Sequence, residues 1–516
     1  MPPVCGGICI YQMNSGLIML IRIVTIILQI LYLICLTGMA IFGLNNIVSM
    51  LLYLKTRNKN LVLPKLPSEK LPTVTIQLPI FNERYMVKRL MKAVSQLDYP
   101  REKLQVQVLD DSKDDTASTV KYLVEQYQAQ GMDFEWVHRT DRKGYKAGAL
   151  KEGFETTTGE LIAIFDADFI PPRNWLLRTV PAFSDPKLGC LQTRWGHLNP
   201  KMNAFTRAVA LGINGHFIVE QTARSRNGLF MNFNGSAGIW RRTCIIDAEG
   251  WQVDTLTEDL DLSYRAQMRG WKVSYLPDVV VPGEIPAQIE AFKKQQFRWA
   301  KGSFQTVKKL FPQLMRADIP EQKRLLGFIH ITGYMVSPMM IETLLLILPL
   351  AFLSPHFLKF LPWTFIPTLG PPLMYLVSQT EENPRWVDRL VLLPMLILIG
   401  FGISVNNSVA VFEGLFKKGT GEFVRTPKFS LTNTRRNWDD KKYKSVISPM
   451  VWGELLLAFY ALVSIYILAP KFGASIIPFF FAFFGGCFFM AGMNILQNWQ
   501  PALKRSTTSL VSRHRS

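Results

Sequence analysis

Residues 161–168 constrain the fold of this 516-residue chain more than any other stretch. Five apolar residues run directly into two carboxylates, Asp166 and Asp168, with one residue between them. Such a run predicts a buried strand that ends at an active-site edge, where two hard oxygen ligands meet a divalent cation. An isolated Asp-x-Asp pair is also common in solvated turns, so its meaning depends on the rest of the chain.

Three more strand-like runs, at 73–78, 104–109 and 134–138, alternate with helical patterns near 84–97, 115–130 and 145–154. This alternation predicts an α/β domain with parallel strands over residues 70–305. Ligands of such sheets bind at the carboxyl ends of the strands. Polar residues gather at those ends: Asn82, Glu83, Asp110, Asp111, Asp166 and Asp168. The dinucleotide and P-loop classes lack support, because neither glycine-rich fingerprint is present.

Long apolar segments indicate a membrane protein with a large water-soluble domain. Hydrophobic residues make up 48% of the chain and charged residues 19%. A bilayer core needs about 20 apolar residues, so residues 16–54 form one long span or two short ones. Further candidate spans are 327–353, 389–413, 449–469 and 475–495. Residues 358–378 are also apolar but rich in proline and glycine, which predicts a broken or re-entrant segment.

The distribution of charge predicts which side these segments face. The net charge is +19, and Lys and Arg outnumber Asp and Glu nine to three in residues 415–447. Basic residues beside spans belong on the cytoplasmic side, so the catalytic domain, this loop and the basic tail are expected there. This requires an even number of crossings before the loop, which leaves 358–378 on the outer side and gives five spans. Lipid head groups and a phosphorylated donor, not nucleic acid, are the expected acidic partners.

Two glycine-containing segments have the composition of ligand-binding loops. Residues 142–149 open a helix with small residues and cations, and Lys146 there suits a diphosphate as well as a solvated basic turn. Asn234 and Gly235 belong to a second such segment, where the backbone can approach a ligand. The six cysteines show no zinc-type spacing, which argues against a thiolate metal site.

Two further motifs lie on predicted helices. Thr257 is expected to cap a helix whose first turn holds Glu258 and Asp259, and an acid there is well placed as a general base. Gln295, Arg298 and Trp299 share one helical face. The Trp299 ring is either an anchor at the membrane interface or a platform for a sugar.

Taken together, these motifs resemble the D, DxD, TED and QxxRW signature of membrane-integrated family 2 glycosyltransferases. The chain is similar to cellulose synthase and to the cellulose-synthase-like mannan and glucan synthases. The resemblance implies an α/β GT-A (nucleotide-sugar transferase) catalytic domain flanked by transmembrane helices. The expected organisation is a transmembrane helix in 1–54, the cytoplasmic GT-A domain in 55–310, interface and transmembrane helices in 311–414, a gating-type loop in 415–447, two transmembrane helices in 448–496 and a basic cytoplasmic tail in 497–516.

The resemblance also implies a role for each motif. Mg2+ or Mn2+ would be held by Asp166 and Asp168, and Asp259 would be the base, with Gln295, Arg298 and Trp299 also catalytic. The donor would be bound by Asn82, Glu83, Asp110, Asp111, Lys146, Thr426 and Lys428. The acceptor would be bound by Trp299, Asn234, Gly235 and Glu258.

Residues 421–428 resemble the gating loop of cellulose synthases, although Arg425 departs from its pattern. Thr426 and Lys428 would then touch the donor phosphates when the loop closes. Asn406, Asn407 and Glu413 lie in or beside a predicted span, where they either line a route for a glycan or hydrogen-bond neighbouring helices.

The expected function is that of a processive, inverting hexosyltransferase of the plasma membrane, or of the Golgi in a eukaryote. It would transfer hexose from GDP-mannose or UDP-glucose to a growing β-linked mannan, glucomannan or β-glucan. The alternative is a non-processive enzyme that adds a hexose to a membrane lipid. A scaffold with an inactive domain is disfavoured, because every carboxylate that the chemistry needs is present.

Overall fold

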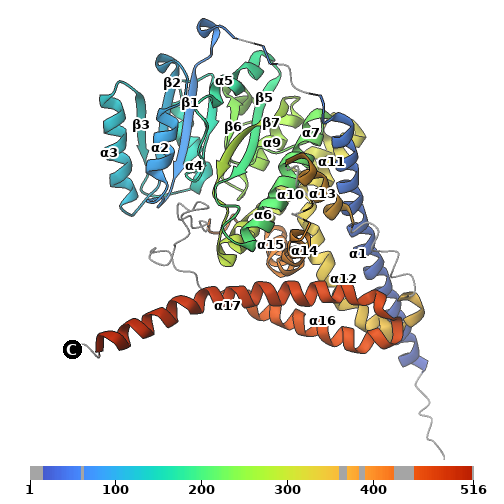
Figure 1. Cartoon of the computed structure of the whole chain (residues 1–516). Helices are drawn as coiled ribbons and strands as arrows, with labels where there is room; N and C mark the ends of the chain where they lie inside the picture. The colour runs from blue at the N-terminus through green and yellow to red at the C-terminus, as the bar shows by residue number, and fades with distance from the viewer. Residues whose placement is uncertain are drawn as a thin grey trace, which may run out of the picture.

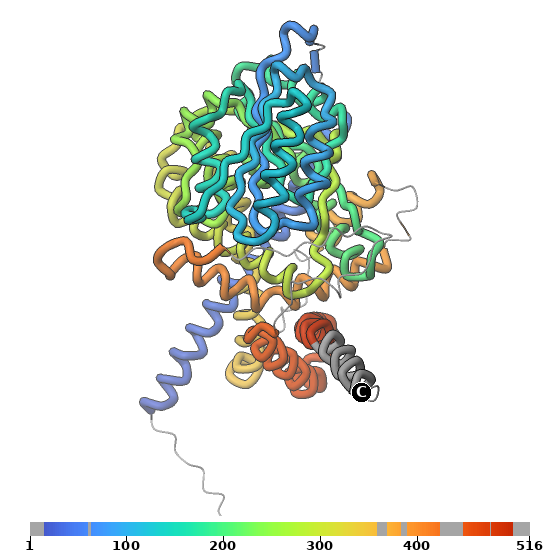
Figure 2. The backbone as a smooth tube through the Cα atoms, turned by 90° about the vertical axis from the view of Figure 1, so that its left-hand side faces the viewer, coloured from blue at the N-terminus to red at the C-terminus, as the bar shows by residue number. Residues whose placement is uncertain are grey.

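The computed structural model describes residues 15–59, 63–64, 66–358, 369–382, 387, 390–423 and 447–513. An α/β domain lies at one end and a group of long apolar helices at the other (Figure 1). Helix α1 (Ser15–Thr56) runs beside the domain, and α16 (Met450–Phe472) and α17 (Ile477–Arg513) lie side by side beneath it. The tube view in Figure 2 shows the same separation between the domain and the helices beneath it.

The domain is built on a seven-stranded sheet with the order β3-β2-β1-β4-β6-β5-β7. The strands are β1 (Val74–Ile80), β2 (Leu104–Asp110), β3 (Asp133–His138), β4 (Leu161–Ile164), β5 (Leu188–His197), β6 (Gly238–Arg241) and β7 (Lys272–Gly283). The first four strands pair in parallel, which confirms the parallel sheet predicted for them. The second half is mixed, because β6 runs antiparallel to both β4 and β5.

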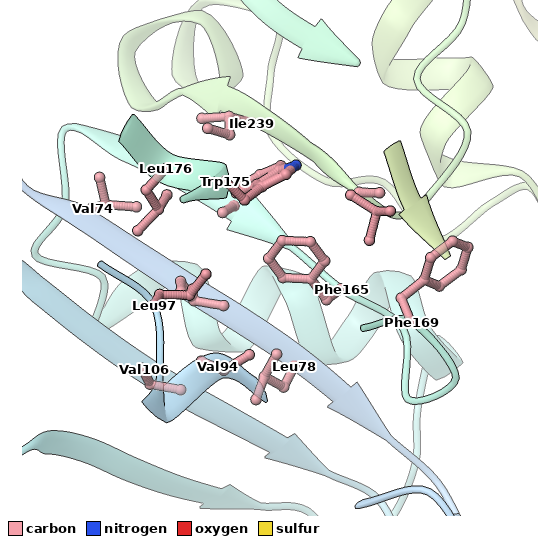
Figure 3. Packing of buried hydrophobic residues seen from close by; sticks show 14 of the residues in the cluster. Val74, Leu78, Val94, Leu97, Val106, Phe165, Phe169, Trp175, Leu176 and Ile239 are labelled. Atoms are coloured by element: carbon pink, nitrogen blue, oxygen red, sulfur yellow. The ribbon is translucent and has the colours of Figure 1, made fainter. Parts of the chain in front are cut away.

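The predicted helices cover the parallel half of the sheet. They are α2 (Val87–Ser95), α3 (Thr116–Ala129) and α4 (Tyr145–Glu155). Strand β4 is buried along its whole length, as a run of apolar residues requires. Just beyond it, the Phe165 ring packs edge-on against Trp175 with centroids 4.6 Å apart (Figure 3). This anchor fixes the chain where it emerges with Asp166 and Asp168.

The remaining helices of the domain follow β4 along the chain. They are α5 (Trp175–Thr179), α6 (Ala204–Asn214), α7 (Thr222–Arg226), α8 (Arg242–Asp247), α9 (Glu258–Met268), α10 (Ile289–Arg316) and α11 (Glu321–Ile331). Among them, α6, α7, α10 and α11 contact the apolar helices. A π-helix, Gly215–Gln221, joins α6 to α7 without a break. Helix α10 leaves the sheet after β7 and packs along α15 (Ser404–Phe416).

Four helices among the described residues are long and apolar enough to cross a membrane. They lie at Ser15–Thr56, Gly333–Leu353, Met450–Phe472 and Ile477–Asn498. The third predicted span is broken: α14 (Leu392–Gly402) and α15 meet at a bend of 41°, and counting them as one span gives five. The predicted ambiguity at residues 16–54 is resolved in favour of one continuous helix.

Helix α13 (Gly370–Glu382) is the described part of the proline-rich segment that was expected on the outer side. Gly370 lies against the backbone of Gly43 in α1. At the other end of α13, Glu381 pairs with Arg57 at 2.6 Å and Glu382 pairs with Arg194 of the catalytic domain at 3.1 Å. The helix therefore ends against the catalytic domain and not on the far side of the apolar helices.

The polar residues of the α15 region connect helices. The Asn406 side chain donates to the backbone carbonyl of Lys293 in α10 at 3.1 Å. Glu413 pairs with Lys301 of α10 at 2.9 Å. These contacts favour the helix-bonding interpretation over a lining for a glycan.

Candidate active site

A cleft opens at the carboxyl ends of β1, β2 and β4, where the sequence placed the site. Most of the predicted residues line it: Glu83, Asp111, Lys146, Asp166, Asp168, Asn234, Gly235, Glu258, Asp259, Gln295, Arg298 and Trp299. Segments that are far apart in sequence therefore converge on one site. Neither Asn82 nor Asp110 is among the lining residues in the part of the chain that the structure describes.

The Asp-x-Asp pair follows β4 and is held from both sides. The backbone N–H of Asp166 donates to Ser236 Oγ at 2.9 Å, and its Oδ1 accepts from Lys146 Nζ at 2.5 Å. Asp168 Oδ2 accepts from the backbone N–H of Glu284 at 3.3 Å. Both carboxylates thus reach the cleft with their backbone fixed.

The two aspartates that follow β2 have different surroundings. Asp111 lines the cleft and accepts two hydrogen bonds from Arg139, at 2.7 and 2.6 Å. Asp110 is fully buried, and its carboxylate accepts from the Ser112 backbone at 2.9 Å and from the Trp136 indole at 3.2 Å. The contacts of Asp110 therefore support the framework of the site, and Asp111 is the one of the two that lines the cleft.

Asn82 also acts within the framework. It has a positive φ of 53°, which asparagine tolerates better than most residues. Its side-chain oxygen accepts from the backbone N–H of Lys113 at 2.9 Å. This contact ties the loop after β1 to the loop after β2, next to the lining residue Glu83.

Gly235 allows the glycine-rich loop to approach the acidic cluster. Its φ is +80°, and a side-chain carbon there would lie 2.9 Å from Asp259 Oδ2 and 3.4 Å from Lys146 Nζ. The Gly235 carbonyl accepts from Lys146 Nζ at 2.8 Å. Lys146 thus bridges this loop to Asp166 across the floor of the cleft.

Helix α10 holds the start of α9 at the same floor. A side chain at Gly302 would collide with Thr257, so the Thr257 side chain packs directly against the backbone of α10. Thr257 occupies the predicted N-cap position, but its side chain makes no capping bond. The prediction that it caps α9 is wrong in this respect, because its hydroxyl instead faces that of Thr306 at 3.2 Å. Asp259 and the Gln295–Trp299 face consequently belong to one rigid unit.

Burial and like charge set the protonation of the acids. Burial, reinforced by the neighbouring Glu258 charge and opposed by Lys146, raises the pKa of Asp259 to about 7. Burial also raises the pKa of Glu258. Burial alone would lower the pKa of Lys146, but the Asp166 and Glu258 carboxylates outweigh it and raise that pKa. Lys146 is therefore a fixed cation, and the raised pKa of Asp259 lies in the range that a general base needs at neutral pH.

Phe423 begins the gating-type segment and lies over the cleft. Its ring stacks on Tyr145 with centroids 5.7 Å apart and contacts the Arg298 guanidinium at 4.4 Å. Arg142 contacts the Phe81 ring at 3.4 Å and lies 5.8 Å from the Phe423 ring. The described end of the predicted loop thus meets the site. Thr426 and Lys428 lie outside the described residues.

Sequence reasoning missed several lining residues, including Arg142, Trp195 and His197. Arg142 belongs to the segment from which only Lys146 was selected, and a second cation beside a phosphate site was the available signal. The Trp195 indole donates to the Ser236 carbonyl at 3.1 Å. Trp195 and His197 come from β5, whose place beside the cleft follows from the mixed strand order and not from local sequence.

The ligand set fits a cation that is shared with a substrate. No group of three or more His, Cys, Asp or Glu able to hold a metal occurs among the described residues. Mg2+ is commonly bound by one or two carboxylates and completed by substrate phosphates and water. Asp166 and Asp168 supply two hard oxygen donors, so a diphosphate in the cleft would complete the site.

The sheet order and the cleft at the strand ends are those of a GT-A catalytic domain. Residues 72–302 match the family model described as "Glycosyltransferase like family 2". These residues are therefore a family 2 glycosyltransferase domain, which confirms the resemblance seen in the motifs. A mannosyltransferase from Pyrobaculum calidifontis, solved in complex with GDP-Man and Mn2+, has the same fold: its TM-score is 0.52 at 19% identity, covering 75% of this chain and 99% of that one.

Two curated relatives come from Oryza sativa subsp. japonica. "Probable glucomannan 4-beta-mannosyltransferase 7" is 38% identical over 370 residues, which cover 69% of this chain and 62% of the relative. "Probable glucomannan 4-beta-mannosyltransferase 11" is 42% identical over 252 residues, which cover 47% of this chain and 44% of the relative. The matches thus span less than two thirds of either relative.

Proposed function

We propose that this chain is a membrane-bound, inverting mannosyltransferase that extends a β-linked mannan or glucomannan from GDP-mannose. The observation that carries the proposal is the convergence in one cleft of the Asp166 and Asp168 carboxylates, the Lys146 ammonium and a third carboxylate, Asp259, whose pKa is raised to about 7. The catalytic domain would face the cytoplasm, and the apolar helices would hold it at the membrane.

The lining residues support a single displacement. Asp259 would take the proton from an acceptor hydroxyl, since its raised pKa suits a general base at neutral pH. Lys146 and Arg298 would stabilise the negative charge that develops on the leaving diphosphate. Mg2+ or Mn2+, held by Asp166 and Asp168, would neutralise the same charge. One base without a second nucleophile gives inversion, so an α-linked donor yields a β-linkage.

The choice of mannose rests on the relatives. Both curated relatives are named as glucomannan mannosyltransferases, and the structural neighbour was solved with GDP-Man. Transfer of glucose from UDP-glucose remains the competing activity. Trp299, on the same face of α10 as Gln295 and Arg298, offers a flat surface for the apolar face of an acceptor sugar.

The test supplies labelled GDP-mannose and labelled UDP-glucose separately to membranes that contain the chain. Each donor is tested with Mg2+, with Mn2+ and with a chelator, and the product is sorted by size and by solubility in organic solvent. The proposal predicts a large, insoluble product from GDP-mannose that a β-mannanase digests and that chelation abolishes. A small, solvent-soluble product would instead identify a glycolipid enzyme, and incorporation from UDP-glucose alone would make the chain a glucan synthase.

A further inference from the structure

The helical connection between α6 and α7 contains a π-helix directly behind the glycine-rich loop of the cleft. The π segment covers Gly215–Gln221. In an α-helix, residues i and i+5 lie about 140° apart around the axis and do not meet. The π-helical pattern bonds i to i+5 and brings those residues together, and such segments are often found at functional sites.

The π-helix lets one imidazole meet two side chains of its own helix. His216 Nδ1 lies 2.9 Å from Glu220 Oε2, and His216 Nε2 lies 3.1 Å from the Gln221 amide nitrogen. The first contact has i, i+4 spacing and the second i, i+5 spacing. A regular α-helix would provide only the first.

The other partner of His216 belongs to the cleft. His216 Nε2 lies 3.1 Å from Asn234 Oδ1, an oxygen that only accepts, so this contact is a hydrogen bond when Nε2 carries the proton, and Gln221 is then a neighbour of the ring and not a donor to it. Asn234 lines the cleft, and its backbone N–H donates to Gln192 Oε1 at 2.9 Å. The next residue, Gly235, contacts Lys146 and packs against Asp259. The Asn234 amide is therefore held from behind by His216 together with Asn232, whose Nδ2 donates to the same oxygen at 3.0 Å.

Glu220 holds the imidazole in place. Burial alone would raise the pKa of Glu220, but its hydrogen bond with His216 and the charge of Arg224 keep that pKa well below its usual range. Glu220 Oε1 accepts from Arg224 Nε at 3.0 Å, and Arg224 is 1% exposed. His330 approaches the same oxygen at 3.8 Å. A carboxylate held by the buried Arg224 guanidinium gives the ring a firm support.

We infer that His216, supported by Glu220, is a positioning residue that orients the Asn234 amide toward the acceptor glycan next to Asp259. This inference rests on the proposed function. It assigns His216 to acceptor binding and not to the donor, because the contact runs to the glycine-rich loop and not to Asp111, Asp166 or Asp168.

The test compares the full chain in detergent with its H216F, H216Q, N234A and H216F/N234A variants. H356F is the matched control, because His356 is exposed and lies outside the catalytic domain. Rates are measured with GDP-mannose as the donor and a β-linked manno-oligosaccharide as the acceptor, each at varied concentration. Hydrolysis of the donor by water is measured without acceptor. Binding of the same saccharide to the chain loaded with GDP and Mn2+ is measured separately.

H216F should raise the acceptor KM and the saccharide Kd about tenfold, the effect of one lost polar contact, and leave the donor KM and donor hydrolysis unchanged. H216Q should keep the acceptor KM and the saccharide Kd within about threefold of wild type, because the glutamine amide can reach Asn234 as well. The double variant should be no worse than N234A, since His216 acts through Asn234.

Three results would overturn the inference: unchanged acceptor KM and Kd in H216F, an equal loss of donor affinity, or additive losses in the double variant. A wild type that does not bind the saccharide would overturn it as well. Transfer by the wild type from a different sugar nucleotide would refute only the choice of mannose and leave the comparison of variants intact.

Discussion

Lowering the pH from 7 to 6 should reduce the donor kcat/KM of this chain about fivefold, and each further unit about tenfold, because Asp259 becomes protonated. A base with a pKa of about 7 is about half ionised at pH 7 and about one-tenth ionised at pH 6. An aspartate with an ordinary pKa would be fully ionised at both pH values. The direction follows from chemistry, since only the carboxylate accepts a proton from the acceptor hydroxyl.

The assay measures initial rates of hexosyl transfer at low donor concentration between about pH 5.5 and pH 8.5, because kcat/KM reports the free enzyme. The E258Q variant separates the causes of the raised pKa of Asp259. Burial is the larger cause and remains in this variant, but the Glu258 charge is removed. The acid limb should therefore move to lower pH without disappearing. A wild-type profile that is flat over this range would refute the assignment of Asp259 as a buried base.

Three further perturbations test other parts of the account. D259N should raise the thermal unfolding temperature more at pH 8 than at pH 5. Because the pKa of Asp259 is higher in the folded than in the unfolded chain, its ionisation begins to destabilise the fold above the unfolded-state pKa and does so in full above about pH 7. An equal gain at both pH values would contradict this. G235A should lower transfer about tenfold or more through strain and contact with Asp259, whereas G228A, with a similar φ of +64° and no atom within 4 Å, should keep its activity. K293M should destabilise the fold by about 3–5 kcal/mol, because it leaves the buried Glu454 carboxylate without its ion pair. The double variant K293M/E454M should regain the lost thermal stability, because an apolar pair can replace a buried ion pair.

The parallel half of the domain was predictable because its signals are local. Each buried strand is an apolar run that ends in polar residues, and parallel strands bring their carboxyl ends to one edge. The sequence alone therefore predicts that Asp111, Asp166 and Asp168 lie together. The face formed by Gln295 and Trp299 followed equally from helical spacing.

The features that were missed depend on contacts distant in sequence or on unusual backbone. Arg142 has a φ of +49°, a conformation that its sequence neighbours do not signal. Asp110 is buried because β3 lies beside β2 and brings Trp136 to it. Glu382 meets Arg194 across 188 residues, and the π-helix around His216 leaves no periodic pattern in the apolar residues. Strand order and helix irregularity are set by contacts that local sequence does not encode.

The most direct test of the central claim compares wild type and D259N in the transfer of labelled mannose from GDP-mannose, together with the binding of GDP in the presence of Mn2+. A general base contributes about 10²–10⁴-fold, so D259N should lose at least about a hundredfold of the transfer rate. Its affinity for GDP should stay unchanged, because Asp111, Asp166 and Asp168 remain. Transfer by D259N at the wild-type rate would contradict the claim that Asp259 is the base of this active site.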